Sequence, residues 1–280
     1  MEETRKRKSD GMSGQGANAR KTKKPWQMPG NKFSPGPSIH PGDAGIWATC
    51  DMHREGQCTA ELKDLFNDYA GLIYGNTAAS NAAVVDEAQL GSDDIEAAIS
   101  QEMQSLQNFK QEALFVPVKI DVRCVLFFKT REPVEPVSFV HRVCSDAMNK
   151  VTSQTTRHVK RLTPMTRMGK ATGRSLEEVA KAVLAPVFHQ DGISAQKYAI
   201  RTTIRNNDTM KRDEVIKRVA DLVGEPHTVD LKNYDRLILV DVYRMILGMS
   251  VVGGDYEKLK RFNIAEIYEP SSTVDASKTP

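Results

Sequence analysis

Hydrophobic and polar side chains alternate along Lys197–Arg205 in the last third of the chain. With the period of a β-strand, one face of this segment is hydrophobic and carries Tyr198, Ile200 and Ile204. The other face carries Lys197, Arg201, Thr203 and Arg205. We therefore expect the first face to pack in a core and the second to present a row of cations. Asn206-Asn207-Asp208 follow and lead toward a helix, whose free N–H groups also attract anions.

The same periodicities divide the rest of the chain into helices and strands. Hydrophobic residues at helical spacing predict helices at Gln57–Ile73, Asp93–Gln107, Val137–Lys150, Ser175–His189 and around Val215–Val223. Branched and aromatic runs predict strands at Gly45–Cys50, Val118–Lys129, His158–Thr163, Thr228–Leu231, Leu237–Tyr243 and Gly248–Val252. This order indicates a small α+β domain followed by an α/β body with a mixed sheet and flanking helices.

Composition changes at both ends of the chain. Residues 1–43 are rich in Gly, Pro, Ser, Asn and Lys and have little to bury, so we expect a disordered basic tail there. Two basic clusters in it, Arg5–Lys8 and Arg20–Lys24, have the spacing of a bipartite nuclear import signal, although a solvated charge run is the alternative. We expect domains at 44–136 and 137–268, a loop or linker at Gly75–Gly91, and a C-terminal tail at 269–280.

Charge is distributed unevenly, although the net charge of the 280 residues is only +3. Lys and Arg exceed Asp and Glu by six in residues 1–40, fall short by nine in 41–140, and exceed them by six in 141–280. Between Asp146 and Glu177 the chain has thirty residues without an acid. A basic end beside an acidic middle indicates two bodies with different partners, of which the basic one faces phosphates.

These patterns select candidate RNA contacts in two segments, the acid-free block and the cationic strand with the residues that follow it. They are Arg157, Lys160, Arg161, Lys197, Arg201, Arg205, Asn206 and Asn207. Lys170 and Arg174 stay open, because a loop could place them elsewhere. The alternative for every one of these cations is an ordinary solvated surface.

Motifs for other chemistry are missing from the sequence. No GxGxxG, no GxxxxGK[ST] and no acetyl-CoA loop occurs, and Val252-Gly253-Gly254-Asp255 lacks the serines of an ATP pyrophosphatase loop, so it is interpreted as a turn. Cys50, His53 and Cys58 offer three metal ligands without a fourth, and nothing places an acid beside His141 and Cys144. We therefore expect no cofactor, no metal, reduced cysteines and no membrane span.

Several segments resemble those of the THUMP-domain proteins that act as tRNA acetyltransferase adaptors. They cover nearly all of residues 44–268 in the same order, and they are GIWATCDMHREGQCTAELKDLFNDYA, VLFFKTREPVEPVSFVHRVC, RHVKRLTPMT, YAIRTTIRNN, LKNYDRLILV and GMSVVGGDYEKLKRFN. The resemblance implies an N-terminal ferredoxin-like domain and a C-terminal THUMP domain that holds the acceptor end of tRNA. It also implies a non-catalytic protein that works with a separate ATP-dependent RNA cytidine acetyltransferase to form N4-acetylcytidine in the D-stem of serine and leucine tRNAs.

Two other classes of function stay open. One is an RNA-modifying enzyme with an unrecognised site, and the other is a general RNA-binding or assembly factor. The resemblance to tRNA acetyltransferase adaptors, together with the basic clusters of the tail, predicts a nuclear or nucleolar protein with some cytoplasmic presence.

Overall fold

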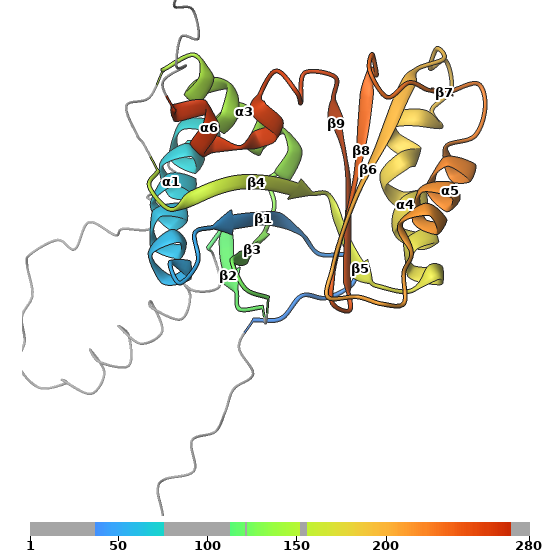
Figure 1. The fold of residues 1–280 in the computed structure, drawn as a ribbon. Helices are drawn as coiled ribbons and strands as arrows, with labels where there is room; N and C mark the ends of the chain where they lie inside the picture. Colours follow the sequence, from blue (N-terminus) through green and yellow to red (C-terminus); the bar gives the residue numbers. More distant parts are fainter. Residues whose placement is uncertain (1–36, 76–112, 121, 152–155, 270–280) are drawn as a thin grey trace, which may run out of the picture. The chain divides into compact units, whose positions relative to one another are not determined.

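The first of two sheets has four strands in the order β2-β3-β1-β4, and every neighbouring pair is antiparallel. The computed structural model describes residues 37–75, 113–120, 122–151 and 156–269 (Figure 1). The strands are β1 (Ala44–Cys50), β2 (Phe115–Val118), β3 (Val125–Thr130) and β4 (Val159–Met165). The helices of this part are α1 (Glu55–Tyr74) and α3 (Pro136–Met148).

The described elements follow the order β1, α1, β2, β3, α3, β4, which is the β-α-β-β-α-β arrangement of ferredoxin-like domains. Aromatic side chains fill the core between helices and sheet, because Phe66 of α1 lies 4.9 Å from Phe115 and 5.3 Å from Phe128 between ring centroids. The start of α3 is set by Glu135, whose carboxylate accepts the backbone N–H groups of Val137 and Ser138. The expected ferredoxin-like domain is confirmed.

The second sheet has five strands in the order β5-β9-β8-β6-β7. These are β5 (Arg167–Lys170), β6 (Lys197–Arg205), β7 (Thr228–Val229), β8 (Arg236–Tyr243) and β9 (Ile246–Gly253). Strand β6 runs parallel to β7 and β8, whereas β9 is antiparallel to β8 and β5. The predicted mixed sheet is confirmed.

Helices α4 (Gly173–Phe188) and α5 (Arg212–Val223) cover one face of this second sheet (Figure 1). Ile238, Val240 and Val242 of β8 pack there against the helices. Leu237, Leu239 and Tyr243 belong instead to the core of the first sheet, where the Tyr243 ring lies 4.7 Å from that of Trp47. Strand β8 is therefore buried on both faces. A short 3₁₀ helix, η2 (Lys260–Phe262), and α6 (Ile264–Tyr268) end the described chain.

The expected single strand Val118–Lys129 is wrong. Its first residue ends β2, and β3 begins only at Val125, with Val118 paired to Phe127 across an antiparallel hairpin. The chain reverses in a segment where polar and hydrophobic residues alternate as they do in a strand. Cys124 has a positive φ of 59° at this reversal, a conformation for which its residue type gives no signal.

Two expected boundaries differ from the contacts in the structure. The first domain was expected to end at residue 136, so α3 and β4 were expected in the second domain. Both belong instead with the first sheet, because β4 pairs with β1 and α3 packs in the core of that sheet. Residues 37–43, expected in the tail, make specific contacts, since Asp43 binds Lys129 at 2.7 Å and the Gly42 N–H donates to Met168 O at 2.8 Å. The helix Asp93–Gln107, the rest of the tail, the segment from residue 76 to 91 and residues 270–280 lie outside the described residues.

Candidate nucleic-acid interface

The alternation predicted for β6 is present in the structure. Tyr198 is buried in the helix-covered core, and Ile200 and Ile204 pack against it. Side chains on the other face of β6 point in the same direction as Leu239 and Tyr243 of β8, toward the core of the first sheet. We call the region where the two sheets meet the junction. In this register Arg201 is opposite Leu239, Thr203 opposite Asp241, and Arg205 opposite Tyr243.

That face is not an uninterrupted row of cations, because Ala199 between Lys197 and Arg201 is buried in the first core. Both arginines lie over tyrosine rings, as cations commonly do. The Arg201 guanidinium is 5.5 Å from the centroid of the Tyr256 ring, and that of Arg205 is 5.9 Å from the centroid of the Tyr243 ring.

Arg161 reaches the same junction from β4 of the first sheet. Its positive charge acts to lower the pKa of Tyr243, as the charge of Arg205 does. It acts in the same way on the pKa of Tyr256, together with the charge of Arg201. The Nε atom of Arg161 is buried and has no hydrogen-bond partner among the described residues. The structure thus brings Arg161, Arg201 and Arg205 together from two sheets, and we call these three residues the junction arginines.

A buried carboxylate lies among these cations. Asp241 of β8 is only 4% exposed, and Thr203 of β6 is opposite it in the register of the sheet. Burial raises the pKa of Asp241 to about 6, although the charges of Arg205 and Arg161 act in the opposite direction. The raised pKa means that ionising this buried group costs folding free energy.

Arg201 is also paired with an acid. Its guanidinium binds Glu257 at 3.0 Å, and the same carboxylate binds Arg261 at 2.6 Å. These cations keep the pKa of Glu257 below its usual value against the effect of burial, which would raise it. Because both groups are partly exposed, a phosphate could compete with Glu257 for Arg201.

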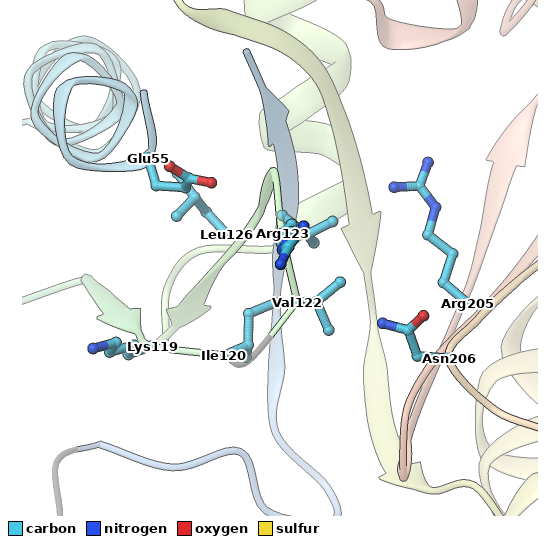
Figure 2. A pocket seen from close by; sticks show the side chains of 9 residues that line it. Glu55, Lys119, Ile120, Val122, Arg123, Leu126, Arg205 and Asn206 are labelled. Carbon is cyan, nitrogen blue, oxygen red and sulfur yellow. The ribbon is translucent and has the colours of Figure 1, made fainter. Parts of the chain in front are cut away.

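An open cavity of about 840 Å³ adjoins the exposed end of this cluster. Figure 2 shows Arg205 and Asn206 on one side of the cavity and the residues of the β2–β3 connection on the other. Its polar lining combines three cations with one carboxylate and one amide, namely Lys119, Arg123, Arg205, Glu55 and Asn206. Its hydrophobic lining is Ile120, Val122, Val125 and Leu126.

The other predicted cations lie apart from the junction arginines. Lys160 is next to Arg161 in β4, but it binds Asp51 at 3.4 Å. Lys197 at the start of β6 binds Asp230 at 3.3 Å. Arg157 is exposed before β4, where its backbone N–H donates to Glu61. Of the two open candidates, Arg174 binds Glu178 on α4, and Lys170 is exposed at the end of β5.

The two predicted asparagines differ in what their side chains do. Asn206 has a positive φ of 52°, which asparagine tolerates, and lines the cavity. The amide of Asn207 is engaged within its own loop, because it donates to Arg244 O at 2.6 Å and accepts the N–H groups of Thr209 and Met210. The structure therefore assigns Asn207 to loop geometry. The N-terminus of α5 carries Asp213 and Glu214, which already occupy the position that favours an anion.

One interpretation of the sequence needs correction. His141 does have an acid beside it, since its Nε2 lies 2.6 Å from Asp255 Oδ2, and Asp255 belongs to the turn after β9. Ser145 Oγ is 3.4 Å from His141 Nδ1, a long contact on the same helix. This pair links α3 to the second sheet. Cys144 on the same helix is buried, which raises the pKa of its thiol, so it is not a nucleophile.

Sequence reasoning missed Tyr243 and Tyr256, whose rings lie under Arg205 and Arg201, and the buried Asp241. A signal for Asp241 was available, because a single acid interrupts the hydrophobic run of β8. Within the described ranges, no three His, Cys, Asp or Glu side chains are grouped to hold a metal ion. None of the helices in the described part of the chain is long and hydrophobic enough to cross a membrane.

Comparison with known proteins defines the class first. Residues 170–252 match the family model of the THUMP domain. The THUMP domain of THUMP domain-containing protein 1, solved in solution, aligns with 30% of this chain and 90% of its own at 26% identity and a TM-score of 0.26.

Full-length relatives define the family. The Saccharomyces cerevisiae protein named tRNA acetyltransferase TAN1 is 34% identical over 86% of this chain and 90% of its own length. An uncharacterized protein of Schizosaccharomyces pombe is 34% identical over 84% of this chain and 79% of its own. The chain belongs to the family of THUMP-domain proteins related to this yeast tRNA acetyltransferase, and it is therefore a THUMP protein related to tRNA modification.

Proposed function

We propose that this chain is a tRNA-binding adaptor. It presents tRNA to a separate ATP-dependent acetyltransferase, which forms N4-acetylcytidine in the D-stem of serine and leucine tRNAs. The observation that carries tRNA binding is the convergence of Arg161, Arg201 and Arg205 from two sheets, beside an open cavity with two further cations.

The chemistry of the junction fits a phosphate backbone. Guanidinium groups bind phosphate through paired N–H donors, and three arginines from two sheets meet at this junction. A-form RNA hides its bases in a deep, narrow groove, so a surface of this kind reads backbone, 2′-hydroxyls and single-stranded ends. The hydrophobic lining of the cavity would suit an unstacked base at such an end.

The non-catalytic part of the proposal has separate support. The sequence has no acetyl-CoA loop and no nucleotide phosphate loop, and the junction consists of arginines, tyrosines and one buried carboxylate. These groups can bind and orient a polyanion. The partner acetyltransferase would then supply acetyl-CoA binding, ATP hydrolysis and acetyl transfer.

A second candidate function is that the chain transfers the acetyl group itself. The name of the yeast relative, tRNA acetyltransferase, favours it. Reconstitution separates the two candidates. Purified chain with substrate tRNA, acetyl-CoA and ATP should give no N4-acetylcytidine, and adding the partner acetyltransferase should restore it. Acetylation by the isolated chain, or full tRNA acetylation by the partner without it, would overturn the adaptor proposal.

A general RNA-binding role outside modification is tested in cells. Nucleosides of tRNA from a strain that lacks the chain should show selective loss of N4-acetylcytidine, with other modifications intact. Loss of many modifications together would favour an assembly factor. We also propose a nuclear or nucleolar location, and it rests on the basic clusters Arg5–Lys8 and Arg20–Lys24, outside the described residues.

A further inference from the structure

The turn that follows β9 has an unusual backbone. Lys260, Arg261 and Phe262 have positive φ angles of 52°, 59° and 56°, in the left-handed region that residues with a Cβ atom seldom adopt. Backbone hydrogen bonds close the turn, since the Arg261 N–H donates to Tyr256 O at 2.8 Å and the Lys260 N–H to Glu257 O at 3.1 Å. Three such residues in succession are strained, and strain of this kind is concentrated at ligand sites and switch regions. The turn is therefore a candidate for a role in function.

The surroundings of this turn hold its backbone in place and leave a cation at the surface. The Phe262 ring is 1% exposed and lies 4.9 Å from the Tyr256 ring between centroids, at an interplanar angle of 87°. Asn263, the next residue, pairs with Arg161 of β4 in an isolated β-bridge. Arg261 is exposed between these two anchors. The turn is thus fixed beside one of the junction arginines.

A carboxylate joins Arg261 to a second junction arginine. Glu257 Oε2 accepts the Nε–H of Arg261 at 2.6 Å, and Glu257 Oε1 accepts an N–H of Arg201 at 3.0 Å. Arg201 also lies over the Tyr256 ring, 5.5 Å from its centroid. One arginine from β6 and one from the turn are therefore held by the two oxygens of one acid. A guanidinium has five N–H donors, so a single contact with a carboxylate does not exhaust either arginine.

Positive charge exceeds negative charge around this contact. The segment Glu257–Arg261 holds one acid and three bases, and its two lysines, Lys258 and Lys260, are exposed. Arg201 adds a further cation from β6. Such a surplus attracts a polyanion, and phosphate need not displace Glu257, since both arginines keep other donors.

We propose that Arg201 and Arg261 together bind a phosphate group of the RNA backbone, and that Glu257 is the positioning residue that holds the two guanidinium groups side by side. This inference rests on the proposed tRNA binding, and it adds Arg261 to the RNA contacts. It gives Glu257 an effect opposite to that of its charge. An acid that only competes with phosphate for Arg201 predicts tighter binding once its charge is removed. Positioning predicts weaker binding, because the RNA must then order two flexible side chains.

Another exposed ion pair provides a matched control. Arg174 and Glu178 on α4 are also four residues apart, and they are also joined through the arginine Nε, at 3.0 Å. Exposed pairs contribute little to stability, so variants of both pairs should fold. Arg261→Gly is a second variant at the turn, because glycine adopts a positive φ without strain and lacks the side chain.

The experiment measures the affinity of the full chain for a serine tRNA, and its dependence on salt. We expect Arg261→Gln, Arg261→Gly and Glu257→Gln each to bind about threefold to tenfold more weakly than wild type. The slope of log affinity against log salt should be smaller by about one unit in both Arg261 variants, because one phosphate contact is lost. Arg174→Gln and Glu178→Gln should stay within about twofold of wild type.

A triple variant adds a reading that a general loss of structure would not produce. In the Arg201→Gln/Arg261→Gln background, Glu257 has neither arginine to position, and its charge only repels the RNA. Glu257→Gln should then leave affinity unchanged or raise it, whereas the same substitution in wild type weakens binding. A purely structural role of Glu257 predicts weaker binding in both backgrounds.

Three results would overturn the inference. They are affinity of Arg261→Gln within about twofold of wild type, equal or tighter binding by Glu257→Gln, and weaker binding by Glu257→Gln in the Arg201→Gln/Arg261→Gln background. If wild type itself does not bind tRNA, the proposed function fails and the inference fails with it. If wild type binds, and Arg161→Gln/Arg205→Gln weakens binding while the Arg261 and Glu257 variants do not, only the inference fails.

Discussion

The two faces of the second sheet are built by the same strands, yet they differ in chemistry. On the face covered by α4 and α5, β8 contributes Ile238, Val240 and Val242, and β6 contributes Tyr198. On the junction face, β8 contributes Leu237 and Leu239 and then the buried Asp241, which is opposite Thr203 of β6. The first face is packed mainly with hydrophobic side chains, and the buried residues of β8 on it carry no charge. The second combines packing with charge, and we interpret it as the binding face.

The difference teaches where the protein tolerates an energetic cost. A fully hydrophobic junction would be more stable, because the attraction between two buried charges seldom exceeds the free energy that it costs to remove both charges from water. The junction instead holds several cations beside one buried acid. The following variants are ordered from the largest expected effect to the smallest, and each addresses one face of this comparison.

Ile238→Ala tests the helix-covered face. Ile238 is fully buried, so the variant should lower the free energy of unfolding by about 2–5 kcal/mol, as other large-to-small core substitutions do. Chemical denaturation measures this change. The salt dependence of tRNA binding should be the same as in wild type, since no cation of the junction is altered. A flattened slope would show that the two faces are not separable.

Asp241→Asn tests the cost of the junction face through its pH dependence. Asp241 is faced by Arg161 of β4, Arg205 and Thr203 of β6, Tyr243 of its own strand and Tyr256 after β9. Its pKa is raised on folding from 3.8 to about 6, so the native state binds the proton more tightly. The stability that this contributes is fully present below 3.8 and is lost as pH rises through about 6.

The stability of wild type relative to Asp241→Asn should therefore be greater at the acidic end of this window, by as much as about 3 kcal/mol. Urea denaturation of both proteins across the window gives the measurement. A difference that is independent of pH would mean that Asp241 does not titrate in this range, and that the junction tolerates its charge without the inferred cost.

Arg205→Gln and Lys197→Gln test whether position on β6 matters. Arg205 faces the cavity and the junction, so its loss should weaken tRNA binding by about five- to tenfold. Lys197 is on the same face but binds Asp230 away from the other arginines, so its loss should change affinity by less than about threefold. Equal effects in a binding titration would favour a uniform cationic row over a localised junction.

Most of the fold followed from periodicity, since it reports which residues are buried. The helices α1, α3, α4 and α5, the alternation in β6 and the mixed sheet were all predictable in this way. The hairpin between β2 and β3 was not, because Cys124 adopts a positive φ without being glycine or asparagine. The placement of β4 beside β1 was also hidden, since strand pairing between distant segments leaves little local signal.

The candidate site was predictable only in part. Arg161, Arg201 and Arg205 stood out by sequence, and the structure brings them together. Lys160 and Lys197 had the same charge pattern but bind acids elsewhere, and Asn207 serves its own loop. Charge in a sequence does not report where the fold places it, so cations that meet at the junction and cations that lie elsewhere look alike until the fold is known.

The central claim is that the junction arginines bind the backbone of tRNA, and the salt dependence of binding tests it most directly. The measurement compares wild type, Arg161→Gln/Arg205→Gln and the control Arg174→Gln/Arg218→Gln, whose arginines bind Glu178 and Glu177. For the junction variant, we predict a loss of affinity and a slope of log affinity against log salt that is smaller by about one to two units, with the control unchanged. An unchanged slope in the junction variant, or an equal loss in the control, would contradict the account.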